Sequence, residues 1–416
     1  MKFISNKLIF KTTFVLTLVL YITQAFCINA EDLSENINLT AVLSLENTTS
    51  YPTEQQLFFK NSRERIISNN YQQLRLITEG QAIENTHYEF HFTSTNQHQN
   101  TENYSTNNSN IYRAKPLRHQ TIQESGTSNY NSWSQEIDRA SVTINLTDLR
   151  FKIGRQPVSW GTGRLWQPLD VFGAFAATDI EREYKPGIDL VSVDYYPSYL
   201  SSLSMIYVFS PIDNSAIKDS QGAIYQIQLG EKSSVSIMLS NISNNRVAGG
   251  SFETDWLNAG WRIEGIIFEE FDSSKISGYF IAGIDYQLEN ETSIAVEYYF
   301  NRSGAHTSQE LEKLTTSTLV LSGLQKQLSE QLLGLSLQNT LTPLITVNYT
   351  LLTAYLSSFE ISTLHQLSGI ISLSDESDLR LSLLLTSGEK LDDSEIPQSE
   401  FGHIPLAATL KYKLYF

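Results

Sequence analysis

The last eleven residues constrain the fold of this chain more than any other segment. Apolar or aromatic side chains occupy every second position from Leu406 to Phe416, and Thr409, Lys411 and Lys413 lie between them. Side chains of a strand point alternately to its two faces, so this segment predicts a strand with one apolar face and one basic face. Such a strand suits a wall between lipid and water, although an amphipathic strand of a soluble domain has the same pattern.

The first residues predict a secretory signal peptide. Lysines precede an apolar run over residues 14–26, which is too short to cross a bilayer comfortably. Ala25 and Ala30 are both small residues at which cleavage is expected. We therefore expect a signal peptide over residues 1–30 and a mature chain over 31–416, with an N-terminal membrane anchor as the alternative.

The charge balance excludes one class of function. The chain has 29 basic and 45 acidic residues, and loss of the three lysines of the signal region leaves 26 basic residues and a net charge of −19. A nucleic-acid partner is not expected, because phosphate contacts need clustered Lys and Arg. Cys27 is the only cysteine and lies in the signal region, so disulfides and cysteine-based metal sites are not expected. Lipid attachment at Cys27 is disfavoured by Gln24 and Phe26.

Short turns and longer loops alternate along the mature chain, as they do between the strands of a membrane barrel. The turns carry the Asn, Asp, Pro and Ser residues that tight reversals need. The predicted turns lie at 375–377, 342–343, 289–290, 231–233, 197–198 and 147–148, and the predicted loops at 388–403, 302–330, 271–275, 211–221, 156–186 and 96–133.

This alternation predicts an all-β fold, a transmembrane antiparallel β-barrel with short periplasmic turns and long outer loops. It yields 18 strands, the first near residues 39–46; residues 356–373 lack clear alternation, so 16 strands stay open. Either number leaves a water-filled lumen. The loop at 96–133 is dominated by polar residues and is expected to be solvated, and residues 308–314 are expected to form a short helix on the outer rim.

The end of the chain also resembles a known targeting signal. Leu410, Tyr412, Leu414 and the terminal Phe416 are similar to the C-terminal pattern by which outer-membrane proteins are recognised for barrel assembly. The resemblance implies the barrel-assembly machinery as a partner and the outer membrane of a Gram-negative cell as the location.

Residues 151–189 hold the densest cluster of Trp, Gly and paired charges in the chain. The segment reads GRQ, then WGTG, then PLDVF, and it resembles a signature of porin-like outer-membrane proteins of Gram-negative cells whose function is poorly characterised. Residues 156–186 fall in the third outer loop, between the fifth and sixth strands. In many porins this loop folds into the barrel and narrows it, and the resemblance in position implies the same here. Gly161 and Gly163 would permit the tight backbone path.

The loop also supplies candidate pore-constriction residues. Opposed charges across a constriction set a transverse field and select solutes by charge, whereas charges that pair with one another only lock the loop. Both interpretations are open for the candidates, which are Arg155, Trp160, Arg164, Trp166, Asp170, Asp179, Arg182 and Lys185.

Other chemistry receives less support from the sequence. His87, Glu89 and His91 share one strand face and are of ligand type, but a polar lumen needs such residues in any case. We find no G-x-S-x-G, H-E-x-x-H or phosphate-binding loop. No catalytic residue, metal or cofactor is therefore predicted, and the chain is not expected to be an enzyme.

The sequence thus favours a porin-like channel for passive or weakly selective diffusion of small hydrophilic solutes. Its expected partners are outer-membrane lipid, the assembly machinery and those solutes, and no residue pattern fixes an oligomeric state. The alternatives are a surface structural protein or adhesin with a closed lumen and, with less support, an outer-membrane hydrolase.

Overall fold

A computed structural model describes residues 37–53, 66–100, 112, 117–123, 129–179, 182–210, 218–271, 275–315, 317–321, 323–356, 360–392 and 396–416. The predicted signal peptide, residues 1–30, and its cleavage site lie outside these residues.

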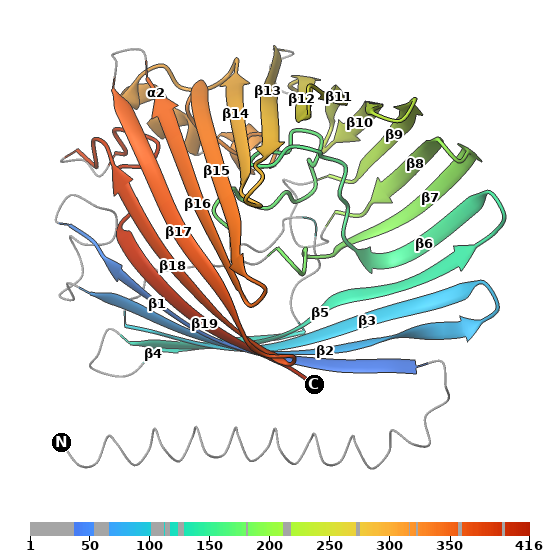
Figure 1. The fold of residues 1–416 in the computed structure, drawn as a ribbon, viewed down its shortest axis with the longest axis horizontal. Coiled ribbons are helices and arrows are strands. Elements are labelled where there is room, and N and C mark those ends of the chain that lie inside the picture. Colours follow the sequence, from blue (N-terminus) through green and yellow to red (C-terminus); the bar gives the residue numbers. More distant parts are fainter. Residues whose placement is uncertain are drawn as a thin grey trace.

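Strands make up most of the described chain and run antiparallel to their neighbours (Figure 1). In chain order they are β1 (Ile37–Tyr51), β2 (Ile67–Ile83), β3 (Thr86–Gln99), β4 (Arg118–Gln123), β5 (Tyr130–Asn145), β6 (Leu149–Gln156), β7 (Ile188–Ser198), β8 (Ser201–Val208), β9 (Ser220–Leu229), β10 (Ser233–Ile242), β11 (Asn245–Trp256), β12 (Ala259–Glu269), β13 (Ile276–Gln287), β14 (Ser293–Asn301), β15 (Gln331–Thr342), β16 (Ile345–Tyr355), β17 (Ile361–Ser374), β18 (Ser377–Ser387) and β19 (Leu406–Tyr415).

The sheet closes on itself. β1 pairs with β2 on one edge and with β19 on the other. At the seam the Phe416 N–H donates to the Ala41 carbonyl at 2.9 Å, and the Ala41 N–H donates to the Phe416 carbonyl at 3.2 Å. The result is a closed 18-stranded antiparallel barrel, which confirms the larger of the two predicted strand numbers.

β4 is not one of the 18 barrel strands. It pairs with residues 130–135 of β5, while β6 pairs with residues 140–145 on the same edge of β5. The prediction of a single loop over residues 96–133 was therefore wrong at both ends, because β3 continues to Gln99 and β5 begins at Tyr130. These strand ends carry polar residues on both faces, which removes the apolar alternation from which a strand is predicted.

Of residues 356–373, where the alternation failed, residues 361–373 belong to a single strand, β17, and the described part of this segment holds no second strand. Leu364 on β17 points inward and is buried in the interior cluster, and Leu367 points outward and is half exposed. Apolar side chains on both faces hide the two-residue period, because here the inner face packs on protein and not on water.

The two surfaces of the barrel are inverted relative to a soluble protein. Large apolar side chains such as Ile153, Ile237 and Ile263 are exposed on the outer surface, whereas Arg75 and Lys413 are buried on the inner surface. An apolar outer band around a polar interior is the pattern of a barrel that crosses a lipid bilayer.

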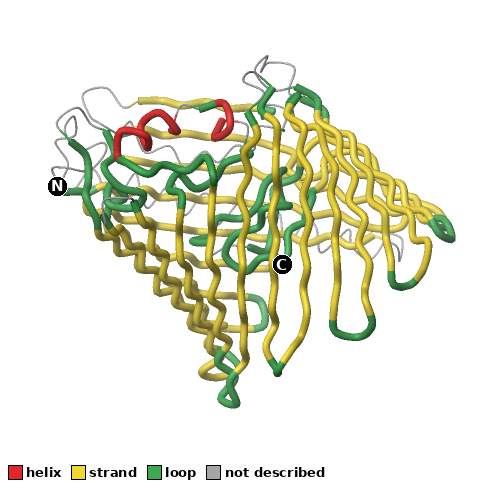
Figure 2. Tube along the Cα trace, turned by 90° about the horizontal axis from the view of Figure 1, so that it is seen from above, coloured by secondary structure: helices red, strands yellow, loops and turns green. Residues whose placement is uncertain are grey.

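Two short helices lie at one rim of the barrel, α2 (Ser308–Thr315) and α3 (Thr318–Leu321) (Figure 2). The helix predicted at residues 308–314 is thereby confirmed. Within the described ranges, neither helix is long and apolar enough to cross a membrane.

Candidate functional site

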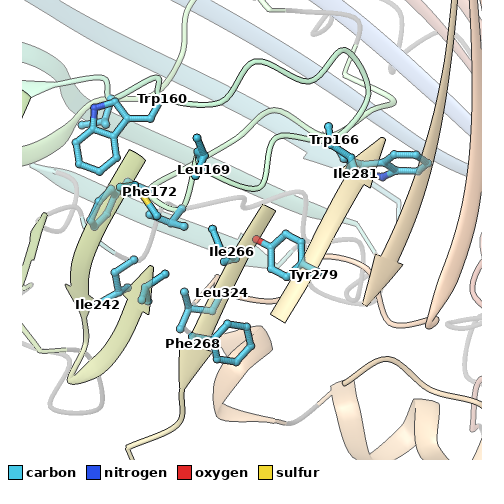
Figure 3. Close-up of a cluster of buried hydrophobic side chains, with 14 of the residues drawn as sticks. Trp160, Trp166, Leu169, Phe172, Ile242, Ile266, Phe268, Tyr279, Ile281 and Leu324 are labelled. Carbon is cyan, nitrogen blue, oxygen red and sulfur yellow. The ribbon is translucent and has the colours of Figure 1, made fainter. Parts of the chain in front are cut away.

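The third loop, described over residues 157–179 and 182–187, leaves the wall at the end of β6 and returns to it at β7. It runs inside the ring of strands and not above it (Figures 1 and 2). Trp160, Trp166 and Phe172 are buried in one cluster with wall residues, among them Ile266 and Tyr279 (Figure 3). The Trp166 ring lies 5.5 Å from the Tyr299 ring, and the Trp160 ring lies 5.9 Å from the Phe172 ring. Aromatic packing therefore holds the loop against the inner wall.

Glu264 of β12 accepts hydrogen bonds from the backbone of the loop. The Thr162 and Leu169 N–H groups donate to its carboxylate at 2.6 Å each, the Gly163 N–H at 3.3 Å and the Thr162 hydroxyl at 2.8 Å. The Glu264 side chain is 0 % exposed. A loop removed from bulk water must find partners for its N–H groups, and this carboxylate supplies them.

Glu297 of β14 does the same for the next three residues. The Arg164, Leu165 and Trp166 N–H groups donate to its two oxygens at 2.6, 2.8 and 3.1 Å. This side chain is also 0 % exposed, and Arg262 lies 3.6 Å away. Two wall carboxylates therefore bind six backbone N–H groups of the third loop and fix its path.

The glycines of the WGTG segment are required by this path. A Cβ atom at Gly163 would lie 1.7 Å from the Trp166 carbonyl oxygen, and one at Gly161 would lie 2.5 Å from the Gln167 Cβ. No side chain fits at these separations, so the backbone can turn here only with glycine.

The far end of the loop contacts the opposite part of the wall. The Glu183 carboxylate pairs with Lys413 of β19, accepts from the Tyr415 hydroxyl at 3.2 Å and lies 3.6 Å from Arg380 of β18. The Arg75 guanidinium lies over the Tyr184 ring, with its Cζ atom 4.5 Å from the ring centroid. The loop therefore reaches from β12 and β14 on one side to β18, β19 and β2 on the other.

Most of the charged candidates predicted from the sequence contact partners that fix the loop. Lys185 pairs with Asp170 and donates to the Val158 carbonyl, and burial lowers the pKa of Lys185. Arg155 forms a bidentate pair with Asp189 at 2.7 and 2.8 Å.

Two other charged candidates, Arg182 and Asp179, bind backbone atoms of the loop. Arg182 donates to the carbonyls of Arg164, Ala176 and Ala177 at 3.1–3.2 Å. Asp179 accepts from the Ala176 N–H at 2.7 Å.

Arg164 differs from the other candidates because its side chain is 59 % exposed. Its guanidinium lies 3.7 Å from Asp285 of β13, which also pairs with Arg262. Glu253 lies 3.7 Å from Arg262. These charges line the inner wall beside the loop. The sequence did not identify the carboxylates at positions 253, 264, 285 and 297 as residues of the site.

One signal could have found them. In strands whose outward positions are apolar, each of these acids occupies an inward position, as in the alternation of Ile263, Glu264 and Gly265. That pattern indicates a lumenal acid, but it does not reveal that the loop backbone is its partner.

His87, Glu89 and His91 do not form a common ligand set in the described part of the chain. His91 lies 3.2 Å from Glu89, but Arg139 and Lys152 also pair with that carboxylate, at 2.7 and 3.3 Å. No group of three or more His, Cys, Asp or Glu side chains suited to a metal ion occurs among the described residues.

No protein-family model and no curated protein sequence matches this chain. Solved structures do match its fold. The chain is similar to Pseudomonas aeruginosa OccK9 (OpdG), with 8% identity, a TM-score of 0.57, and coverage of 92% of this chain and 98% of that one. It is also similar to Acinetobacter baumannii OccAB2, with 8% identity, a TM-score of 0.55, and coverage of 92% of this chain and 98% of that one. For P. aeruginosa OccD3 (OpdP) the identity is 9%, the TM-score is 0.54, and the coverage is 92% of each chain. At these identities the likeness establishes the fold, which is that of outer-membrane porins.

Proposed function

We propose that this chain is an outer-membrane channel through which small hydrophilic solutes diffuse, and that the third loop constricts it. The loop itself carries the proposal. It is folded into a closed barrel, and buried carboxylates hold it on one side while an ion pair holds it on the other. A loop built only for the cell surface would need no such anchoring.

The outer surface supports a membrane location. Exposed apolar side chains cover the strands, and the structural neighbours are porins of the outer membrane. Because these neighbours are channels, we infer a channel and not an enzyme.

We further propose distinct roles for the loop candidates. Trp160, Trp166, Asp170 and Lys185 fix the loop, because they are buried in its packing. Arg164 is the residue that meets solute, because its charge lies in the solvated lumen beside Asp285.

The decisive experiment is single-channel recording of the purified mature protein in a planar bilayer with a salt gradient across it. Stable current steps with a reversal potential support the channel and report its charge preference. Protein that is shown to be folded but passes no current would contradict it.

The closed-lumen surface protein is the second candidate. One observation favours it, because the third loop contacts strands on both sides of the lumen. The recording above separates the two, since a closed barrel conducts only after the loop has been released.

A further inference from the structure

The outer ends of β1, β2, β3 and β5 carry an unusual outward surface. Side chains on these strands alternate between the lumen and the outside, with Glu46, Arg75 and His91 on the lumenal side. The positions on the opposite side, from residue 47 of β1 across to residue 135 of β5, form what we call the amide face. Tyr51, at the end of β1, borders this face, whose members are Asn47, Thr49, Ser68, Asn70, Gln72, Ser94, Asn96, His98, Asn131, Trp133 and Gln135.

The amide face begins where the apolar band ends. On β2 the outward residue Gln72 is followed by Leu74 and Leu76, and on β3 Ser94 is preceded by Phe92. Strand pairing places these changes one outward position apart on neighbouring strands, because Leu74 lies opposite Ser94 and Leu76 opposite Phe92. The change from apolar to polar therefore follows a line across neighbouring strands, as the edge of a bilayer would.

Hydroxyl and amide groups dominate this face above that line. All its members other than His98 and Trp133 are Asn, Gln, Ser or Thr, and none is an acid. They are arranged in rows by strand pairing. Asn47 donates to Asn70 at 2.8 Å, and His98 lies 2.8 Å from Asn131. On β2 the face extends over three outward positions, which is roughly 13 Å along the strand.

An aromatic side chain lies within the polar rows. Trp133 pairs across the strands with Asn96 on one side and Gln120 of β4 on the other, and the Arg118 guanidinium lies 5.0 Å from its ring centroid. Amide groups that donate and accept, together with an aromatic ring, match the hydroxyls and apolar faces of sugars. An acid-free face gives no electrostatic preference for a basic protein partner.

We propose that the amide face binds the oligosaccharide of the glycolipid that forms the outer leaflet around the barrel. A lipid whose chains pack on Leu74 and Phe92 places its headgroup beside Gln72 and Ser94, and in that leaflet the headgroup is a chain of sugars. The inference rests on the proposed membrane location, but not on whether the barrel conducts.

The test compares lipids that differ only in their sugars. Purified mature protein in detergent is titrated with rough-type lipopolysaccharide, which carries core sugars, and with its lipid A alone, while the midpoint of thermal unfolding and the affinity are measured. We expect the core-bearing lipid to bind more tightly and to raise the midpoint further. Equal effects of the two lipids would overturn the proposal.

A pair of double variants locates the binding site. Gln72 and Asn96 are cross-strand partners on the amide face, and Gln73 and Thr95 are the adjacent partners facing the lumen. The Gln72→Ala/Asn96→Ala variant should lose about tenfold in affinity for the core-bearing lipid through the loss of neutral hydrogen bonds. The Gln73→Ala/Thr95→Ala control should keep it.

Two further outcomes would overturn the proposal. One is equal loss in both double variants. The other is that the face associates with a second copy of the chain, detected as a cross-linked dimer of Asn70→Cys together with unchanged glycolipid binding. Single-channel recording of the same variants keeps the channel separate, because a conducting variant without sugar binding leaves the proposed function intact.

Discussion

Replacing Glu297 by Gln should release part of the third loop from the wall. The carboxylate accepts three loop N–H groups at 2.6–3.1 Å inside a fully buried site. Hydrogen bonds to a charged acceptor contribute about 1 kcal/mol more than neutral ones, so the change weakens loop anchoring by roughly 3 kcal/mol. Arg262, 3.6 Å away, also loses a charged partner.

A loss of that size changes the loop equilibrium by about two orders of magnitude, since each 1.4 kcal/mol is a factor of ten. A loop that leaves the wall rarely in the parent should do so often in the variant. The barrel itself should persist, because its strand pairing does not pass through the Glu297 side chain.

Single-channel recording measures this directly. We expect Glu297→Gln to show a noisier open level and additional conductance states, with heat-modifiable migration on gels unchanged. Glu289→Gln, at an exposed turn, is the matched control and should behave as the parent. If the Glu297 variant is folded and its current traces match the parent, the carboxylate does not hold the loop.

Three further predictions concern the same loop and its neighbour. Gly163→Ala would place a methyl group 1.7 Å from the Trp166 carbonyl oxygen, so the loop should lose its closed path and conductance should rise or become irregular, whereas a parent-like trace would contradict the backbone argument. Arg164→Ala removes an exposed lumenal charge, so the reversal potential should shift toward cations while the free energy of unfolding changes by less than about 0.5 kcal/mol; an unchanged reversal potential would place Arg164 outside the solute path. Lys326, between α3 and β15, donates to the Asp170 carbonyl oxygen of the third loop at 2.9 Å. Burial lowers the pKa of Lys326 to about 8, so the unfolded chain binds more protons than the folded one between that pH and the ordinary lysine range, and stability should rise with pH across that window. Denaturant titrations at pH 7.5 to 10 should show this rise in the parent and a smaller one in Lys326→Met.

Local pattern was enough to predict the barrel strands that face lipid on one side and water on the other. The alternation from Leu406 to Phe416 matches β19, with Lys411 and Lys413 on the lumenal face. The turn at residues 375–377 and the helix at 308–314 also follow from short-range preferences of the backbone. These features need only neighbours in the sequence and a knowledge of which solvent each face meets.

Local pattern failed where the surroundings of a strand differ from lipid and water. The outer ends of β3 and β5 meet polar surroundings on both faces. On β17 the inward side chain of Leu364 packs against protein, although the inner face of a barrel strand was expected to meet water. In both cases the two-residue period that marks a barrel strand is lost, although the strand is present.

The third loop shows the same division. From the sequence alone, its place between the fifth and sixth strands, its need for Gly161 and Gly163 and its supply of paired charges were apparent. Only the closed barrel brings Glu264 and Glu297, more than 90 residues away in the chain, to its backbone N–H groups. Those hydrogen bonds depend on the positions of β12 and β14 in the closed barrel. The position of a strand in a closed sheet is set by the pairing of the whole chain, so no local sequence pattern contains it.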